Sequence, residues 1–210
     1  MPFLLLLLGA LAVPQFPTQF VATVETTAHL VDKSKTYPPW LRRVRLAYDF
    51  VNKRARASIL AGYDAGKNYT RRYDEKHEYV VRGGEFPDCQ RCYMGEPMPP
   101  PQLPRDARRE TDALIDGRPV EHWVVDNHPA VERSHLYFDA ASRLPRRLVN
   151  EMLESGEHLI PIMTYDILDL ELVVPADLAF ALDPPWHHDN CTRRAGGWPY
   201  LHLFHHYLMI

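Results

Sequence analysis

Apolar and polar residues alternate along several short segments of this chain, and this pattern limits the folds it can adopt. From 43 to 50 the apolar side chains fall on every second position, and the residues between them are mostly charged. This period of two is typical of a β-strand with one buried face. Further segments of this kind, separated by turn residues, lie at 20–30, 54–60, 69–73 and 77–82. The first half of the chain therefore predicts an antiparallel meander.

The second half opens on a hairpin signal. Asp116-Gly117 separates two apolar segments, and this dipeptide supplies the positive φ angles of a tight β-turn. Further strands are expected at 134–149, around a turn that starts at Asp139, and at 159–172. Residues 175–180 are compatible with one helical turn, and the tail at 196–210 fits a helix or a last strand equally well. The predicted fold class is mostly β (α+β).

Length, composition and charge indicate one globular domain over residues 13–210. The chain has 210 residues, of which 46 % are hydrophobic and 24 % charged, unlike a disordered segment. Nineteen prolines disfavour long helices, and residues 97–104 form a proline-rich internal loop that, with the cysteine pair before it, reads as a long connection between strands. A net charge of −3 does not indicate the basic surface with which proteins bind nucleic acids, so we expect no nucleic-acid partner.

The N-terminal segment 1–12 has the pattern of a signal peptide. It is uncharged, carries a leucine run, and ends on Ala10-Leu-Ala12, a small-residue cleavage pattern. The run is too short to cross a bilayer, which takes about 20 helical residues, so we expect no transmembrane anchor. The alternative is a buried first strand. The expected location is outside the cell or in the lumen of the secretory or endolysosomal system.

The chain has three cysteines, so at least one of them cannot pair in a disulfide within the chain. Cys89 and Cys92 form a Cys-x-x-Cys, and Cys191 lies far downstream. Redox catalysis by Cys-x-x-Cys needs a following helix, and the prolines after Cys92 prevent one. The structural alternative is a disulfide from either of the pair to Cys191, which secretion would favour. Secretion would also make the sequons at Asn68 and Asn190 available for glycosylation.

Histidines concentrate near the C-terminus, where five of the eleven fall within twenty residues: His187, His188, His202, His205 and His206. These side chains, with Asp189, are the ligand types that zinc prefers, but their spacing matches no established metal motif. The alternative is a set of surface or interface histidines. No serine-nucleophile elbow, phosphate-binding loop or other catalytic motif occurs, so we predict neither an enzyme nor a cofactor, and we assign no metal ligands.

Three parts of the sequence resemble known families. Residues 137–147 place an aromatic residue and Asp before a turn and Leu-Pro-Arg after it, which resembles a strand-turn-strand element of the LolA-like lipoprotein-carrier fold. Residues 48–56, Gly62, Cys89 and the ending 180–191 are similar to ependymin-related secreted proteins. The same order resembles the non-catalytic N-terminal domain of some papain-like cysteine peptidases. The likeness covers roughly residues 20–191.

The resemblance implies a curved antiparallel sheet or half-barrel, with one or two short helices, that wraps a hydrophobic cleft. It also implies a secreted, often glycosylated protein in which Cys89 pairs with Cys191 and Cys92 is an extra thiol. The His-rich tail has no counterpart in these families. The catalytic segments of a papain-like peptidase do not follow, so the resemblance implies no peptidase activity.

A curved sheet offers one wide apolar face, which is where a ligand cleft would form. The expected lining residues are Trp40, Val44, Leu46, Tyr48, Phe50, Trp123, Val125, Leu136 and Phe138. The alternative is that these side chains are simply the packed core, because an alternating strand always has a buried face.

Three classes of function follow. The first is a secreted, non-enzymatic protein that binds an apolar small molecule or lipid in the concave face of its sheet. The second is a protein-interaction module, binding a partner or a second copy of itself through the sheet or through residues 97–104. The third is a thiol-redox or metal-binding protein that uses Cys89 and Cys92 or the C-terminal histidines.

Overall fold

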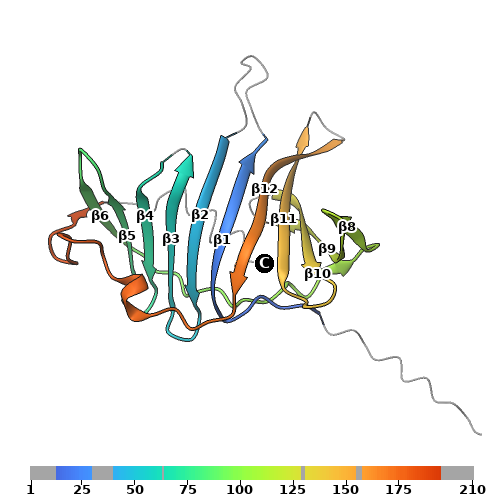
Figure 1. The fold of residues 1–210 in the computed structure, drawn as a ribbon, viewed down its shortest axis with the longest axis horizontal. Coiled ribbons are helices and arrows are strands. Elements are labelled where there is room, and N and C mark those ends of the chain that lie inside the picture. Colours follow the sequence, from blue (N-terminus) through green and yellow to red (C-terminus); the bar gives the residue numbers. More distant parts are fainter. Residues whose placement is uncertain (1–12, 30–39, 63, 129–130, 155–157, 195–210) are drawn as a thin grey trace, which may run out of the picture.

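Thirteen β-strands form one sheet in the computed structural model of the chain, which describes residues 13–29, 40–62, 64–128, 131–154 and 158–194. The strands are β1 (Gln19–Ala28), β2 (Trp40–Asp49), β3 (Arg54–Gly62), β4 (Lys67–Arg72), β5 (His77–Arg82), β6 (Asp88–Tyr93), β7 (Arg108–Arg109), β8 (Ala113–Ile115), β9 (Arg118–His128), β10 (Val131–Asp139), β11 (Pro145–Glu154), β12 (His158–Glu171) and β13 (Thr192–Arg193). Figure 1 shows them side by side.

Two meanders meet where β1 pairs with β12. The order across the sheet is β13-β6-β5-β4-β3-β2-β1-β12-β11-β10-β9-β7, with β8 paired to β9. Within each meander, neighbouring strands pair antiparallel, while the short β13 runs parallel to β6. This order puts the first and twelfth strands in the middle of the sheet and leaves the two meanders to form its two wings.

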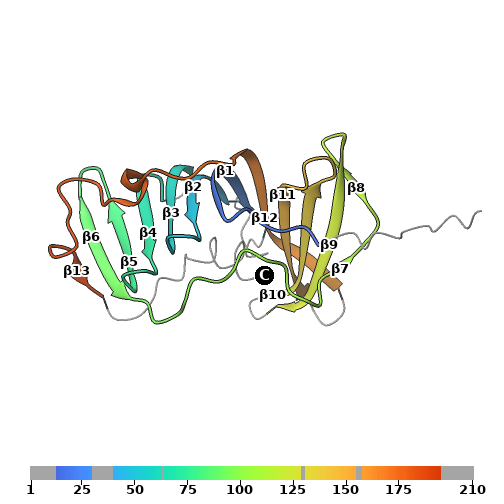
Figure 2. The same ribbon diagram turned by 90° about the horizontal axis from the view of Figure 1, so that it is seen from below.

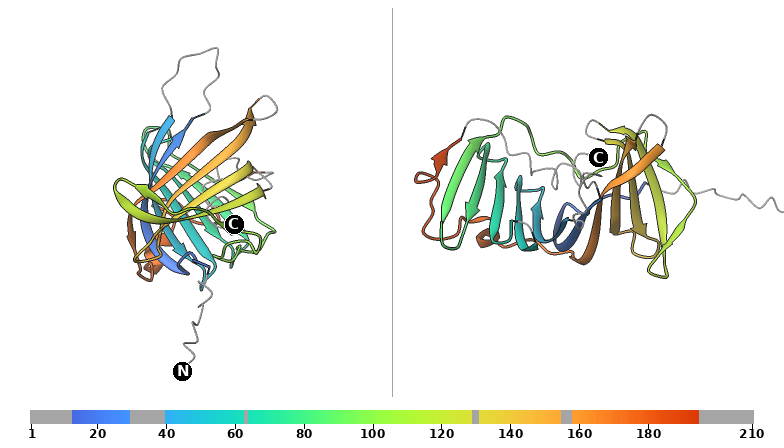
Figure 3. Two further views of the ribbon diagram at one scale, coloured as in Figure 1. Left: turned by 90° about the vertical axis from the view of Figure 1, so that its right-hand side faces the viewer. Right: turned by 90° about the horizontal axis from the view of Figure 1, so that it is seen from above.

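The sheet curves into an open trough whose two edges do not meet (Figure 3). The main apolar cluster lies on the concave face, and it takes every second residue of the strands, as the alternation in the sequence requires. A register shift of one residue would expose this whole set, so burial of one face fixes the strand pairing.

A long connection crosses the concave face. Residues 94–107, which we call the strap, leave β6, the neighbour of the edge strand β13, and reach β7 at the other edge, below the sheet in Figure 2. Five prolines between 97 and 104 exclude a regular helix and favour extended backbone. Met98 and Leu103 of the strap belong to the buried concave cluster, so the strap covers part of the trough.

Residues 173–191 cover part of the opposite, convex face. This segment leaves the end of β12 and returns across β3 to β6, where Leu182 and Trp186 pack on a second, smaller cluster. Charged contacts hold it: Arg54 Nη2 donates to Asp177 Oδ1 at 2.6 Å, and Arg56 Nη2 donates to both oxygens of Asp183 at 2.8 Å. The segment ends at the disulfide between Cys191 and Cys89 of β6.

The mostly β, curved and antiparallel architecture is confirmed, but the expectation of one or two short helices is wrong. Within the described residues the helical content is one 3-10 turn, η1 (Asp177–Phe180), where a helical turn was predicted at 175–180. A second error concerns the Cys-x-x-Cys segment, which forms strand β6 instead of part of a connection. Too few alternating apolar residues flank the cysteines for the pattern to have indicated a strand.

The predicted hairpin at Asp116-Gly117 is confirmed. These residues form the turn between β8 and β9 and have φ angles of 51° and 76°. The turn predicted at Asp139 joins β10 to β11, and its carboxylate Oδ1 accepts hydrogen bonds from the backbone N–H groups of Ala141 and Ser142. The signal segment and the tail at 196–210 lie outside the described residues.

Candidate functional site

The residues predicted to line a cleft come together on the concave face. Seven of them are buried in the main apolar cluster: Val44, Leu46, Tyr48, Trp123, Val125, Leu136 and Phe138. Phe50 is partly buried and packs against the same cluster. Trp40 is the first residue of β2, and its side chain lies outside the described part. The alternation thus identifies one shared face of the two meanders.

Irregular segments cover this face. Phe16, which precedes β1, packs edge to face on Phe138 with ring centroids 5.6 Å apart. The Tyr48 hydroxyl donates to the Pro99 carbonyl of the strap at 3.4 Å. Gln15 and Gln102 form an isolated antiparallel bridge, which joins the N-terminal segment 13–18 to the strap. In the described part of the chain, the concave face therefore has neither a helix nor a second sheet over it.

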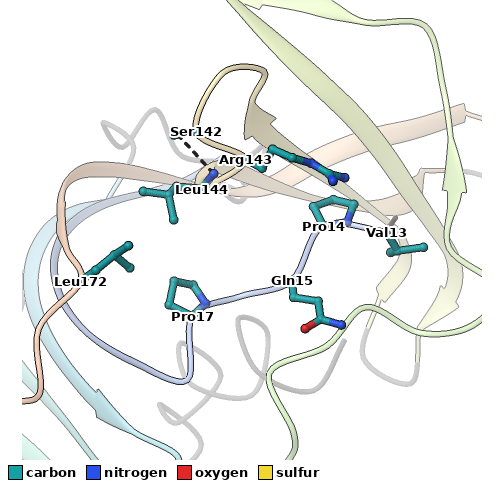
Figure 4. Close-up of a pocket in the computed structure, with 8 residues that line it drawn as sticks. All are labelled: Val13, Pro14, Gln15, Pro17, Ser142, Arg143, Leu144 and Leu172. Atoms are coloured by element: carbon teal, nitrogen blue, oxygen red, sulfur yellow. Dashed lines mark hydrogen bonds between the residues drawn. The ribbon is translucent and has the colours of Figure 1, made fainter. Parts of the chain in front are cut away.

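An open pocket lies at one end of the trough (Figure 4). Its volume is about 530 Å³, within the usual range for ligand sites. The lining residues are Val13, Pro14, Gln15, Pro17, Ser142, Arg143, Leu144 and Leu172. The first four lie on either side of Phe16, whose ring is inserted into the concave cluster. The pocket is therefore bounded by the same segment that covers the concave face.

A buried cluster of polar side chains lies within the apolar concave face, near β4 to β6. Arg71 Nε donates to Glu78 Oε1 at 2.8 Å, and Arg71 Nη1 donates to the Tyr73 hydroxyl at 2.9 Å. The Cys92 thiol donates to Glu78 Oε2 at 3.6 Å. Burial raises the pKa of Glu78, although Arg71 opposes the shift. Such a buried ion pair is sustained by its hydrogen bonds, because an isolated charge would be very costly there.

The two cysteines of the Cys-x-x-Cys face opposite sides of the sheet. Cys89 is in the convex cluster and is joined to Cys191 in a disulfide, the pairing that the resemblance implies. Cys92 is free and buried in the concave cluster. Three residues along a strand span about 10 Å and reverse the side-chain direction, so the two thiols cannot pair with one another. Burial, followed by the Glu78 carboxylate, raises the pKa of Cys92 to about 12. The thiol-redox alternative is wrong for this pair.

The two sequons lie in different surroundings. The Asn68 amide nitrogen, which would carry a glycan, donates to Asp183 Oδ2 at 2.6 Å, so modification would break one of the contacts that hold the segment 173–191. Asn190 is exposed and closes a turn by accepting a hydrogen bond from the His187 N–H at 2.7 Å. Glycosylation at either site stays a prediction.

The structure describes two of the five C-terminal histidines, His187 and His188. His188 Nδ1 hydrogen-bonds to the Tyr79 hydroxyl at 2.7 Å and packs against that ring. His187 lies in the adjacent turn, and His202, His205 and His206 lie outside the described residues. Within the described ranges, no group of three or more His, Cys, Asp or Glu side chains is arranged to hold a metal ion.

Three side chains that complete the concave face are not predicted by the sequence pattern. Phe16, Met98 and Leu103 lie in segments without periodicity, flanked by prolines. The only signal for them is that a large apolar residue stands alone among prolines and polar residues. Arg71 and Glu78 were also missed, because their positions within β4 and β5 look like those of an ordinary solvated face.

Comparison of the sequence with protein-family models and with curated proteins finds no match. Solved structures do match. An uncharacterized conserved protein from Thermus thermophilus is 14 % identical with a TM-score of 0.56, over 84 % of this chain and 91 % of that one. A LolA superfamily protein from Nitrosomonas europaea is 11 % identical with a TM-score of 0.39, over 80 % of this chain and 93 % of that one. The MucA/MucB complex from Pseudomonas aeruginosa contains a chain that is 14 % identical, with a TM-score of 0.47, over 79 % of this chain and 56 % of that one.

These comparisons concern the fold. The Thermus protein shares the fold of this chain along nearly the whole of both chains. A LolA superfamily protein is among the similar structures. The ependymin and peptidase resemblances stay predictions. No helix in the described ranges is long and apolar enough to cross a membrane.

Proposed function

We propose that this protein is a secreted, non-enzymatic binding protein that holds an apolar small molecule or lipid against the concave face of its sheet. The proposal rests on the kind of segment that covers this apolar face. A sheet of this width normally buries its apolar face under helices or a second sheet. In the described part of this chain, the cover is an extended strap and a short N-terminal segment.

The cover contributes Phe16, Met98 and Leu103 to the concave cluster, and the bridge from Gln15 to Gln102 joins its two parts. Its described hydrogen bonds to the sheet include the one from the Tyr48 hydroxyl, one from the Phe50 N–H to the Thr18 carbonyl at 2.9 Å, and one from the Met94 N–H to the Lys76 carbonyl at 2.8 Å. We infer that a cover attached in this way can be displaced. An apolar ligand that replaces these side chains would keep the concave face buried, so the exchange costs little hydrophobic free energy. The open pocket beside Phe16 gives the ligand a place to enter.

A polar group on the same face would orient the ligand. Ser134 Oγ donates to Asn150 Oδ1 at 3.0 Å, while the Asn150 amide nitrogen is buried and has no hydrogen-bond partner in the described structure. A buried donor without a partner is costly, and binding sites commonly use one or two such groups to fix a ligand. We therefore propose a ligand with an oxygen acceptor on an otherwise apolar body.

Secretion is part of the proposal. It rests on the signal-like segment 1–12 and on the buried disulfide between Cys89 and Cys191, since disulfides persist outside the cytosol. We propose that the mature chain starts at Val13, directly beside the pocket. A protein partner on the same face is the competing possibility.

Energy transfer from tryptophan to a dansyl-labelled long-chain fatty acid tests the proposal. Trp123 lies on the concave face, and Trp186 lies on the convex side. We expect saturable binding with strong transfer, which Trp123→Phe reduces and the matched variant Trp186→Phe leaves nearly unchanged. Absence of saturable binding overturns the apolar-ligand proposal. If only Trp186→Phe reduces the transfer, the ligand binds on the convex face, which contradicts the proposal.

A further inference from the structure

A second open pocket, of about 470 Å³, lies at the edge of the sheet where β13 pairs with β6. The two strands lie side by side at this edge in Figure 2. The side chains that give the pocket its polar character are Arg91, Arg193, Arg194, Asp189, His77 and Tyr93. Three arginines against one aspartate leave an excess of two positive charges when the histidine is neutral. The pocket is therefore cationic, although the whole chain has a net charge of −3.

Two of these arginines are placed side by side by the strand register. Arg91 and Arg193 are direct partners in the parallel pairing of β6 with β13. Direct partners project from the same face of a sheet, and neighbouring strands lie about 4.8 Å apart. Like charges in such positions repel one another and destabilise the pairing. An anion between the two guanidinium groups would replace this repulsion by two attractions.

These two arginines differ from most arginines of the protein. In the described part of the chain most arginines pair with a carboxylate, as Arg71 does with Glu78 at 2.8 Å. Arg91 and Arg193 have no ion pair among the described residues. Arg91 Nη1 donates to the His188 carbonyl at 2.7 Å, which holds this guanidinium at the pocket wall.

We propose that this pocket binds a phosphate group between Arg91 and Arg193. A guanidinium group donates two parallel N–H bonds to two oxygens of one anion, which is the geometry that phosphate offers. A phosphate monoester carries a charge of about −1.5 to −2 at neutral pH, which matches the excess charge of the pocket better than a single carboxylate does. The exposed Tyr93 hydroxyl, which has no hydrogen-bond partner among the described residues, supplies a further donor.

The neighbouring acidic side chains leave the site available to a ligand. Asp189 lines the pocket but forms no ion pair within the described residues. Glu75, in the turn before β5, is paired with Arg72. The two acidic groups therefore do not neutralise the arginine pair.

The arginine pair stands on a covalently fixed frame. Cys89 and Cys191 form the disulfide, and each lies two residues before one of the paired arginines. Because side chains two residues apart share a face, Arg91 and Arg193 lie on the convex side with the disulfide, away from the proposed apolar ligand. The Arg194 N–H donates to the Arg91 carbonyl at 2.8 Å and extends the pairing beyond β13. A site held in this way loses little conformational freedom when it binds.

Titration of the full chain with potassium phosphate tests the site, with potassium chloride adjusted to hold the ionic strength constant and the arginine Nε–H resonances as the readout. Arg193→Gln removes a guanidinium that has no hydrogen bond or ion pair among the described residues, so the fold should be retained. Arg82→Gln is the matched control, because Arg82 is also exposed, lies on the neighbouring β5 and does not line the pocket.

We expect Arg193→Gln to weaken phosphate binding by at least about tenfold and Arg82→Gln to leave it unchanged. Arg193→Lys should recover only part of the affinity, because it keeps the charge and loses the paired donors.

Flotation with phosphatidylcholine vesicles, with and without phosphatidic acid, identifies the source of the phosphate group. Flotation that needs both phosphatidic acid and Arg193 assigns a lipid headgroup, while Arg193-dependent binding of inorganic phosphate alone assigns a soluble phosphate compound. Equal behaviour of Arg193→Gln and Arg82→Gln in both experiments overturns the proposal, because the phosphate would then respond only to the overall charge of the chain.

Discussion

Phe16 packs edge to face on Phe138, with ring centroids 5.6 Å apart, and this contact joins the N-terminal segment to the far wing of the sheet. Phe138 lies in β10, several strands from β1 in the sheet order. The aromatic pair therefore crosses the trough instead of following a strand pairing. Phe16 is the largest side chain that the cover contributes to the concave cluster.

Phe16→Ala should open the trough. Loss of a buried phenylalanine is expected to lower the free energy of unfolding by about 3 kcal/mol. Affinity for the dansyl fatty acid should rise, because less cover has to be displaced. Phe86→Ala is the control, since Phe86 is 76 % exposed and its loss should leave both quantities nearly unchanged. If Phe16→Ala instead weakens fatty-acid binding, Phe16 is part of the binding surface and not a displaceable cover.

Cys191→Ser should remove a long-range crosslink. The disulfide closes a loop with a sequence separation of 102, so its loss should lower the free energy of unfolding by about 4 kcal/mol, measured by urea denaturation. Dithiothreitol should destabilise the unsubstituted chain and Cys92→Ala but have no further effect on Cys191→Ser. A thiol assay on unfolded protein should count one free thiol in the unsubstituted chain and two in Cys191→Ser. Reductant-sensitive stability in Cys191→Ser would refute the pairing.

Asp49 should contribute stability that depends on pH. Burial alone would raise the pKa of Asp49, but hydrogen bonds from Asn52, Gln19 and Arg54 outweigh it and hold the pKa below its ordinary value. A carboxyl group with a lowered folded-state pKa stabilises the fold above its unfolded pKa and loses this effect as pH falls through the folded pKa.

Asp49→Asn is therefore expected to cost about 2 kcal/mol at about pH 7, with a difference that shrinks below about pH 4. Urea denaturation at a series of pH values measures it. Asp177→Asn is the control, because that carboxylate also contacts Arg54 but is 91 % exposed. A constant difference between Asp49→Asn and the unsubstituted chain at all pH values would show that the Asp49 charge is not what stabilises the fold.

Gly62 and Gly66 give a matched pair of substitutions on either side of one turn. Both have positive φ, 88° and 85°, so alanine is strained at each. At Gly62 a Cβ would lie 1.9 Å from the Leu41 carbonyl oxygen, while at Gly66 it would meet nothing within 4 Å. Gly66→Ala should cost about 1 kcal/mol in unfolding free energy, and Gly62→Ala several times more. Equal costs would show that β2 and β3 do not approach closely at Gly62.

The strands could be predicted because each carries its own signal. In β2 the alternation of Val44, Leu46 and Tyr48 follows directly from burial of one face, and the Asp116-Gly117 turn follows from local backbone chemistry. Strand β6 was missed because its two cysteines are buried on opposite faces, which gives no alternation of apolar and polar residues.

The cover of the concave face could not be predicted, because its contacts are long-range and its segments have no period. Nothing in the sequence near Phe16 or Leu103 indicates that either reaches the trough. The placement of Arg91 beside Arg193 depends in the same way on the parallel pairing of β6 with β13. The residues were visible in the sequence, but their proximity required the sheet register.

Native mass spectrometry of the mature chain, secreted from a eukaryotic host, followed by extraction with organic solvent, can detect a ligand that the protein acquires when it is made. We expect a discrete adduct of lipid-like mass that solvent releases and that re-forms when the extract is returned to the bare protein. A bare polypeptide mass both on secretion and after incubation with an excess of mixed lipids would contradict it, and would turn the concave face into a site for a protein partner.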